Sequence, residues 1–274
     1  MTEHASVYKL NLPSIPLSHQ VKYLIHANLR NSFLWLRQTF QASEPEYSSQ
    51  ENRAKYEETW TKDRPEELNQ SFSRVSRVDS RLVELPLTTQ YAFVSSLIAA
   101  EIEAQINRVK EVAEVGAGSG RVLIPLAKKF PEIRFHAIEP TRAGCLKVAE
   151  SAERLNLQNV DVYCCSAERM AADLQLKVEF VYTNLALEQI GGLNIAELAL
   201  RNTIALLSSD GFFLFREPWR DINGPLKRSY LRSAKYWPLS TDSIRSITSH
   251  SASIELCRIQ HNLRFNVGVC RGAL

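Results

Sequence analysis

Three glycines at alternate positions follow an acidic residue in the segment VAEVGAGSGRVLIPLA. Glu114 comes first, then Gly116, Gly118 and Gly120, where an apolar run typical of a buried strand gives way to a helical pattern. Glycine at such a turn lets the backbone bend tightly and approach a ligand, because no Cβ is in the way. Arg121 stands where a dinucleotide-binding fold has its last glycine, which argues against a nicotinamide cofactor.

An acidic residue ends the next predicted strand, about twenty residues after the glycine turn. The strand IRFHAIE covers residues 133–139 and ends in Glu139. A carboxylate at this place can accept hydrogen bonds from both hydroxyls of a ribose. The glycine turn, its strand context and Glu139 together predict a nucleoside-containing cofactor. A nicotinamide-dependent oxidoreductase shares this arrangement and remains an alternative class, which cofactor affinity would distinguish.

The runs EVGAGSG, AIEP and CSAE, in this order, resemble the class I S-adenosylmethionine-dependent methyltransferases, and the resemblance covers residues 96–274. It implies S-adenosylmethionine as cofactor, with the glycine loop under its methionine part and Glu139 at its ribose. It also implies that the loop of Ser166, Ala167 and Glu168 flanks the adenine. The commoner family residue at 166 is aspartate, so we expect adenine contacts there mainly through backbone groups. A serine that caps the next helix is the plainer alternative, and both roles can coexist.

The residues after the fourth predicted strand bear on the methyl acceptor. They start NLALEQI at Asn184 and resemble the segment that passes beside the sulfonium in small-molecule methyltransferases, which assigns Asn184 and Leu185 to the cofactor site. The Pro-Pro of DNA amino-methylating enzymes, the metal-binding Asp of catechol-type enzymes and the Pro-Cys of cytosine methylases are missing here. We therefore expect a small-molecule substrate, with no nucleic-acid partner, no membrane partner and no metal.

Three side chains are candidates for the proton acceptor, because parallel strands place ligands at their carboxyl ends. Glu188 follows the fourth strand, Glu217 ends the fifth, and His261 lies in the loop of a C-terminal hairpin. A neutral imidazole with an ordinary pKa of about 6.5 suits deprotonation of a hydroxyl near neutral pH. Glu217 is favoured instead by resemblance to the Glu-Pro-aromatic stretch of sugar and natural-product O-methyltransferases. Glu188 could fix the loop beside the cofactor, and a mechanism without a dedicated base is also open.

Four further residues are candidate substrate contacts. Arg216 and Trp219 flank the end of the fifth strand, Tyr230 lies in the basic, aromatic stretch 227–237, and Trp60 is a possible lid contact. Core packing is the alternative for Trp219, and a solvated amphipathic helix is the alternative for Tyr230.

The sequence as a whole predicts transfer of a methyl group from S-adenosylmethionine to a small molecule, first of all to a hydroxyl in a biosynthetic pathway. N-methylation of a small amine and a non-catalytic cofactor-binding partner subunit are the alternatives. The substrate and the oligomeric state stay open, although a homodimer is possible.

The elements that must position these residues follow from the apolar pattern. From about residue 96, short apolar runs alternate with helical patterns, which predicts βα units around a Rossmann-like, seven-stranded, mostly parallel sheet with a C-terminal antiparallel hairpin. The predicted strands are 111–115, 133–139, 160–166, 178–184 and 212–218, followed by the hairpin strands 254–260 and 264–271. The predicted helices are 95–108, 120–130, 141–156 and 193–208.

Residues 1–93 differ from the rest of the chain in composition and apolar pattern. They contain many polar and aromatic residues and an apolar stripe with helical spacing over 19–40. The stretch 41–80 is too polar to fold comfortably alone. We expect a helical cap that closes over the substrate of a methyltransferase domain formed by residues 94–274.

Composition agrees with a folded, 274-residue enzyme and excludes several classes. Thirty-three Lys and Arg against 30 Asp and Glu leave a net charge of +3, too little to favour phosphate-backbone binding. The five cysteines lack zinc-site spacing and are expected to be reduced interior thiols. With no signal-peptide pattern and no long apolar run, the expected location is cytoplasmic.

Overall fold

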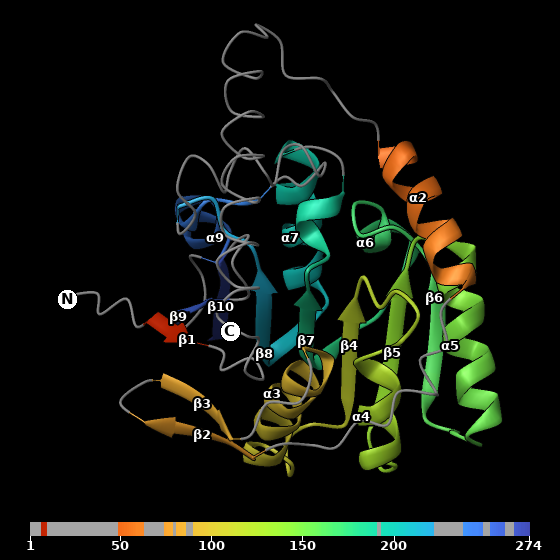
Figure 1. Ribbon diagram of the computed structural model, residues 1–274, viewed down its shortest axis with the longest axis horizontal. Coiled ribbons are helices and arrows are strands. Elements are labelled where there is room, and N and C mark those ends of the chain that lie inside the picture. The colour runs from red at the N-terminus through yellow and green to blue at the C-terminus, as the bar shows by residue number, and fades with distance from the viewer. Residues whose placement is uncertain are drawn as a thin grey trace, which may run out of the picture.

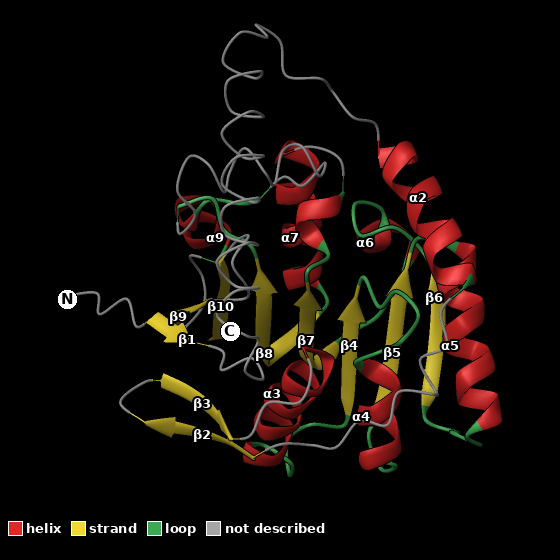
Figure 2. Ribbon diagram, in the orientation of Figure 1, coloured by secondary structure: helices red, strands yellow, loops and turns green. Residues whose placement is uncertain are grey.

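The computed structural model describes residues 7–9, 49–62, 74–78, 81–85, 90–190, 193–221, 238–248, 253–260 and 266–274. Within these ranges a central sheet carries helices on both faces (Figures 1 and 2). The His261 loop, Tyr230 and the predicted helix over 19–40 lie outside the described residues.

The central sheet has eight strands in the described part of the chain, in the order β1-β9-β10-β8-β7-β4-β5-β6. Its parallel strands are β4 (Glu111–Val115), β5 (Arg134–Glu139), β6 (Val160–Cys164), β7 (Val178–Asn184) and β8 (Leu207–Glu217). The C-terminal strand β10 (Asn266–Ala273) pairs antiparallel with β8 and with β9 (Ser253–Gln260). The predicted Rossmann-like sheet with its antiparallel hairpin is confirmed. Strand β1 (Val7–Lys9), parallel to β9, is an eighth strand that the sequence did not predict.

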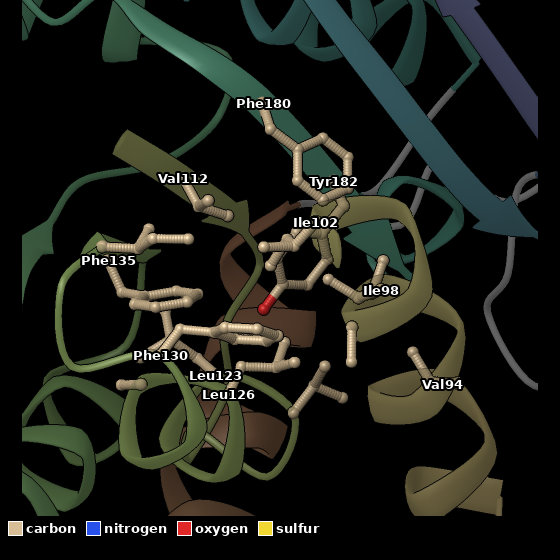
Figure 3. Packing of buried hydrophobic residues seen from close by; sticks show 14 of the residues in the cluster. Val94, Ile98, Ile102, Val112, Leu123, Leu126, Phe130, Phe135, Phe180 and Tyr182 are labelled. Carbon is tan, nitrogen blue, oxygen red and sulfur yellow. The ribbon is translucent and has the colours of Figure 1, made fainter. Parts of the chain in front are cut away.

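Helices cover both faces of the parallel strands and explain why these strands are continuous apolar runs. On one face lie α3 (Gln90–Ala104), α4 (Leu123–Lys129) and α5 (Arg142–Arg154). On the other face lie α6 (Met170–Asp173), α7 (Leu193–Ala205) and α9 (Thr241–Ile247). Figure 3 shows the first core, where Ile98 of α3 and Leu123 of α4 pack toward Phe180 and Tyr182 of the sheet.

The order of the strands reverses between β4 and β7. From β4 the chain continues outward through β5 and β6, and then returns to place β7 and β8 on the other side of β4. In open α/β sheets, ligands bind outside the carboxyl ends of the strands at such a switch point. The topology therefore puts the glycine loop after β4 and the loop after β7 side by side at one edge of the sheet.

The described N-terminal segments contain more than helix. Helix α2 (Ser49–Thr61) lies along α5 at one side of the sheet (Figure 1). Strands β2 (Arg74–Val78) and β3 (Arg81–Leu85) form an antiparallel pair that the sequence analysis did not predict. No helix in the described residues is both long and apolar enough to span a bilayer.

The thiols follow the predicted pattern with one exception. Cys145, Cys165 and Cys270 are free and buried, whereas Cys164 is free and exposed. The prediction of an interior thiol is wrong for Cys164, because it is the last residue of the edge strand β6, which has a neighbour on one side only.

Candidate functional site

A cavity of about 340 Å³ lies at the carboxyl ends of β4, β5 and β7. This volume is within the range of about 300–1,000 Å³ that is usual for small-molecule sites. Nine of the ten residues predicted to bind the cofactor line the cavity: Glu114, Gly116, Gly118, Glu139, Ser166, Ala167, Glu168, Asn184 and Leu185. The tenth, Gly120, is not on the wall and packs against Ile124 and Val148.

The glycine loop has a backbone conformation that side chains disfavour. Gly116, Gly118 and Gly120 have φ angles of +78°, +56° and +86°, all in the left-handed region. A Cβ on Gly116 would lie 2.3 Å from the Cβ of Ala186 in the loop after β7. Only glycine therefore allows these two loops to approach each other this closely.

Glu139 is fixed at the cavity wall by three donors from the protein. Its carboxylate accepts hydrogen bonds from the Gly118 amide (2.8 Å), the Thr141 amide (3.1 Å) and the Thr141 hydroxyl (2.6 Å). Gly144, at the start of α5, makes room for this arrangement, because a Cβ there would lie 2.7 Å from Glu139 Cγ. Two carboxylate oxygens offer about four acceptor sites, so capacity remains for a hydroxyl of a ligand. Burial raises the pKa of Glu139, and the three donors oppose this shift.

Glu114 is a second buried carboxyl group on the wall. Its Oε2 accepts a hydrogen bond of 2.9 Å from the Tyr182 hydroxyl. Burial, with a smaller contribution from the charge of Glu139, raises the pKa of Glu114 to about 8. At neutral pH the neutral acid is therefore the main form of this group.

The loop after β6 lines the cavity and carries a buried hydroxyl group, that of Ser166. Ser166 Oγ is buried and has no hydrogen-bond partner among the described residues. The alternative role of this side chain as a helix cap is not seen, since Ser166 Oγ accepts from no backbone amide of the described residues and Arg169 is the N-cap residue of α6. Asn202 of α7 holds the loop by donating to the carbonyls of Ala167 (3.0 Å) and Glu168 (2.9 Å). A buried polar atom without a partner at a cavity wall fits a site built for a polar ligand.

Helix α2 contributes one side of the cavity wall. Arg53, Tyr56 and Trp60 line it, and the Trp60 ring packs so closely over Gly118 that a Cβ there would lie 2.9 Å away. Glu57 of the same helix accepts a hydrogen bond of 2.8 Å from the Ala143 amide. That amide is in the first turn of α5, where backbone N–H groups have no partner within the helix. The sequence offered Trp60 as a lid contact, and the structure places it over the glycine loop.

Apart from Trp60, the predicted catalytic and substrate residues of the described chain do not reach the cavity wall. Glu188 and Glu217 are each 3% exposed, Arg216 is fully buried, and none of them lines the cavity. Arg216 Nη1 lies 2.5 Å from Asn184 Oδ1, which does line it. Trp219 is buried against Gly268 of β10. These side chains pack behind the wall because β8 lies inside the sheet, between β7 and β10.

Several residues at the site were missed by sequence reasoning. Thr141 and Gly144 fix Glu139, and Tyr182 holds Glu114. The signal for Thr141 was present, since a threonine before a helical pattern is a typical N-cap, and its side chain does accept from the Gly144 amide at 3.2 Å. Glu57 carries no such signal, because its partner is 86 positions away in the chain.

Comparison with known proteins places this architecture among methyltransferases. The family model Methyltransf_4, "Putative methyltransferase", matches residues 108–184. The structure is similar to the N-methyltransferase NodS from Bradyrhizobium japonicum WM9 in complex with S-adenosylhomocysteine, with a TM-score of 0.57 and 11% identity over 81% of this chain and 97% of NodS. The predicted resemblance to class I S-adenosylmethionine-dependent methyltransferases is confirmed, and the predicted enzyme class and cofactor agree with these matches.

Two relatives of this chain have names that describe RNA methyltransferases. A tRNA (guanine-N(7)-)-methyltransferase of Staphylococcus haemolyticus is 39% identical over 54 residues, which is 20% of this chain and 25% of the relative. A ribosomal RNA small subunit methyltransferase G of Flavobacterium psychrophilum is 33% identical over 120 residues, 44% of this chain and 56% of the relative. The chain thus spans between a quarter and just over half of the length of these relatives.

These relatives correct one expectation. The prediction that the protein has no nucleic-acid partner is wrong, since the matched sequences are those of tRNA and ribosomal RNA methyltransferases. Net charge alone did not support that exclusion, because it averages over the chain and does not report a local binding surface.

Proposed function

We propose that the protein is an S-adenosylmethionine-dependent methyltransferase. The observation that carries this proposal is Glu139, which the Gly118 amide and Thr141 hold at the cavity wall beside a left-handed glycine loop. An acid at the end of the second parallel strand, next to such a loop, is the arrangement that holds the ribose of a nucleoside cofactor.

In this proposal, different described residues contact the ribose, the adenine and the methionine part of the cofactor. Glu139 accepts from the ribose hydroxyls, and the loop from Ser166 to Glu168 flanks the adenine. The loop from Gly116 to Gly118 lies at the methionine part. S-adenosylmethionine supplies an electrophilic methyl group on its sulfonium, so alignment and exclusion of water are the main tasks of the protein. Helix α2 serves both tasks, since Trp60 covers Gly118 and Glu57 ties α2 to α5.

A hydroxyl of a small molecule is the first candidate for the acceptor. The side of the cavity wall that α2 contributes supports an acceptor small enough to enter between the covered loops. A guanine base of an RNA is the second candidate, and the match to the tRNA (guanine-N(7)-)-methyltransferase supports it. N-methylation of a small amine uses the same site without a dedicated proton acceptor.

The cofactor half of the proposal predicts selective binding. Isothermal calorimetry on the full chain should show binding of S-adenosylhomocysteine and negligible binding of NAD and NADP, because the Arg121 position lacks the last dinucleotide glycine. The opposite preference would replace the methyltransferase by an oxidoreductase.

The acceptor can be identified with S-adenosylmethionine that carries tritium in its methyl group. The full chain is incubated with total RNA in one reaction and with a small-molecule extract in another. Label that enters RNA and is released by ribonuclease indicates the RNA candidate, whereas label in an organic-soluble product indicates the small molecule. Cofactor binding without transfer to either fraction would favour the non-catalytic partner subunit.

A further inference from the structure

The turn after β7 has a strained backbone at the cavity wall. Leu185, the first residue after the strand, has a φ angle of +55°, which a residue with a side chain rarely adopts. Leu185 and Ala186 both line the cavity. A residue persists in this conformation only where its surroundings hold it there, and such strain is often found at functional sites.

Three hydrogen bonds hold this turn in place. The Leu185 amide donates to the Arg216 carbonyl of β8 at 2.9 Å, and the side-chain amide of Gln189 donates to the Leu185 carbonyl. The Ala186 amide donates to both carboxylate oxygens of Glu217, at 3.1 Å each. The Ala186 methyl group in turn lies against Gly116. Glu217 is therefore connected to the glycine loop through a single residue.

A second carboxyl group completes the arrangement behind the turn. Glu188 is buried, and burial together with the charge of Glu217 raises its pKa well above the ordinary value. Gln189 donates to Glu188 Oε1 at 3.0 Å, and Glu188 Oε2 is buried with no hydrogen-bond partner among the described residues. The other groups that face this pair are Arg216 of β8 and, through Arg216, Tyr91 of α3. Both Glu217 oxygens accept from the Ala186 amide, and the raised pKa of Glu188 favours its neutral form beside them.

We propose that Glu217 is a positioning residue whose carboxylate holds the Leu185–Ala186 turn against the glycine loop and so shapes the cavity wall for the cofactor. This role replaces the proton acceptor suggested by sequence resemblance, because Glu217 is behind the wall and acts through the backbone of Ala186. The inference rests on the proposed function for the identity of the cofactor, but its structural part can be tested without one.

The ligand-free test is hydrogen–deuterium exchange of the full chain. In Glu217→Ala, the amides of residues 184–190 should exchange about tenfold faster or more, since a charge-assisted hydrogen bond to a buried amide is lost. Glu179→Ala is the matched control, because Glu179 also accepts two backbone amides, those of Lys110 and Glu111, at the opposite end of the sheet. It should leave exchange in 184–190 unchanged. Unchanged exchange in Glu217→Ala would overturn the proposal.

The second test is affinity for S-adenosylhomocysteine by calorimetry. Glu217→Ala should weaken binding about tenfold or more, and Glu217→Gln should restore it to within about threefold of the wild type, since its amide oxygen still accepts from Ala186. In the wild type, affinity should fall at alkaline pH as Glu188 ionises beside Glu217 and the two buried charges repel. Glu188→Gln, which cannot ionise, should reduce this fall, and the remainder is assigned to Glu114 on the cavity wall, whose pKa is about 8.

The outcomes separate the two proposals. If the wild type does not bind S-adenosylhomocysteine while Glu217→Ala still accelerates exchange at 184–190, the cofactor assignment fails and the positioning role stands. If the wild type binds and Glu217→Ala binds within twofold of it, the positioning role fails. Should Glu217→Ala not fold, Glu217→Gln and Glu188→Gln decide through the pH profile, where a profile like the wild type in Glu188→Gln contradicts the proposal.

Discussion

Replacing Glu139 by alanine should weaken the binding of S-adenosylhomocysteine about 100-fold. The substitution removes the acceptor for the ribose hydroxyls, and each hydrogen bond to a charged group is worth about 1.5–3 kcal/mol, while 1.4 kcal/mol corresponds to tenfold in affinity. It also leaves the Gly118 amide and the Thr141 hydroxyl without their acceptor, which loosens the glycine loop. Calorimetry at neutral pH measures the effect.

A control variant must show that the effect of Glu139→Ala comes from loss of the ribose contact and does not follow from removing any glutamate of a strand. Glu111 begins β4, at the opposite edge of the sheet, where it contacts His136 at 2.9 Å. Glu111→Ala should keep the affinity of the wild type. Equal affinities of Glu139→Ala and Glu111→Ala would show that Glu139 does not contact the ligand.

Replacing Glu114 by glutamine should stabilise the protein at pH 7 by about 3 kcal/mol. In the folded chain the pKa of Glu114 is raised from 4.5 to about 8 by burial, so the native state keeps a proton that the unfolded chain has lost. The contribution of Glu114 to the free energy of unfolding is therefore complete below pH 4.5. It is lost as the pH rises toward 8, at about 1.4 kcal/mol for each pH unit. Glutamine stays neutral in both states and still accepts from Tyr182, so it avoids this loss.

Urea unfolding between pH 5 and pH 9 measures the effect. The stability of the wild type should fall with rising pH, and the slope should be smaller in Glu114→Gln. Some slope should remain, because burial also raises the pKa values of Glu139 and Glu188. A wild-type stability that is constant over this range, or a less stable Glu114→Gln variant, would contradict the inferred protonation of Glu114.

The parallel strands could be predicted closely because each is a short apolar run with a local signal at its end. Strands β4 and β7 have the predicted bounds, and β5 begins one residue later than predicted, at Arg134. Helix α3 begins at Gln90, five residues before the predicted start, although Thr88 and Thr89, residues of a type common at N-caps, precede it in the sequence. Hairpin β2–β3 was missed because its two strands, RVSRV and RLVEL, lie in the stretch that was assigned to a helical cap. Strand β1 has three residues, too few to show a period.

The residues that line the cavity were predictable for the same reason as the strands, since Gly116, Gly118 and Glu139 stand at strand ends and the topology brings those ends together. The roles of Glu188 and Glu217 were not predictable. A position after a strand says that a side chain is near the active edge, but it does not say whether the side chain faces the cavity or the core.

The sequence by itself determined the parallel sheet, the strand that carries the glycine loop and the acid that faces it, because these depend on local apolar periodicity and on glycine spacing. Only the tertiary structure decided which polar groups meet across the chain. Glu57 reaches the start of α5, and Glu217 reaches the Ala186 amide 31 positions away. Contacts of this kind depend on how elements distant in sequence pack and on which side chains are withdrawn from water, and neither is contained in the local pattern of residues.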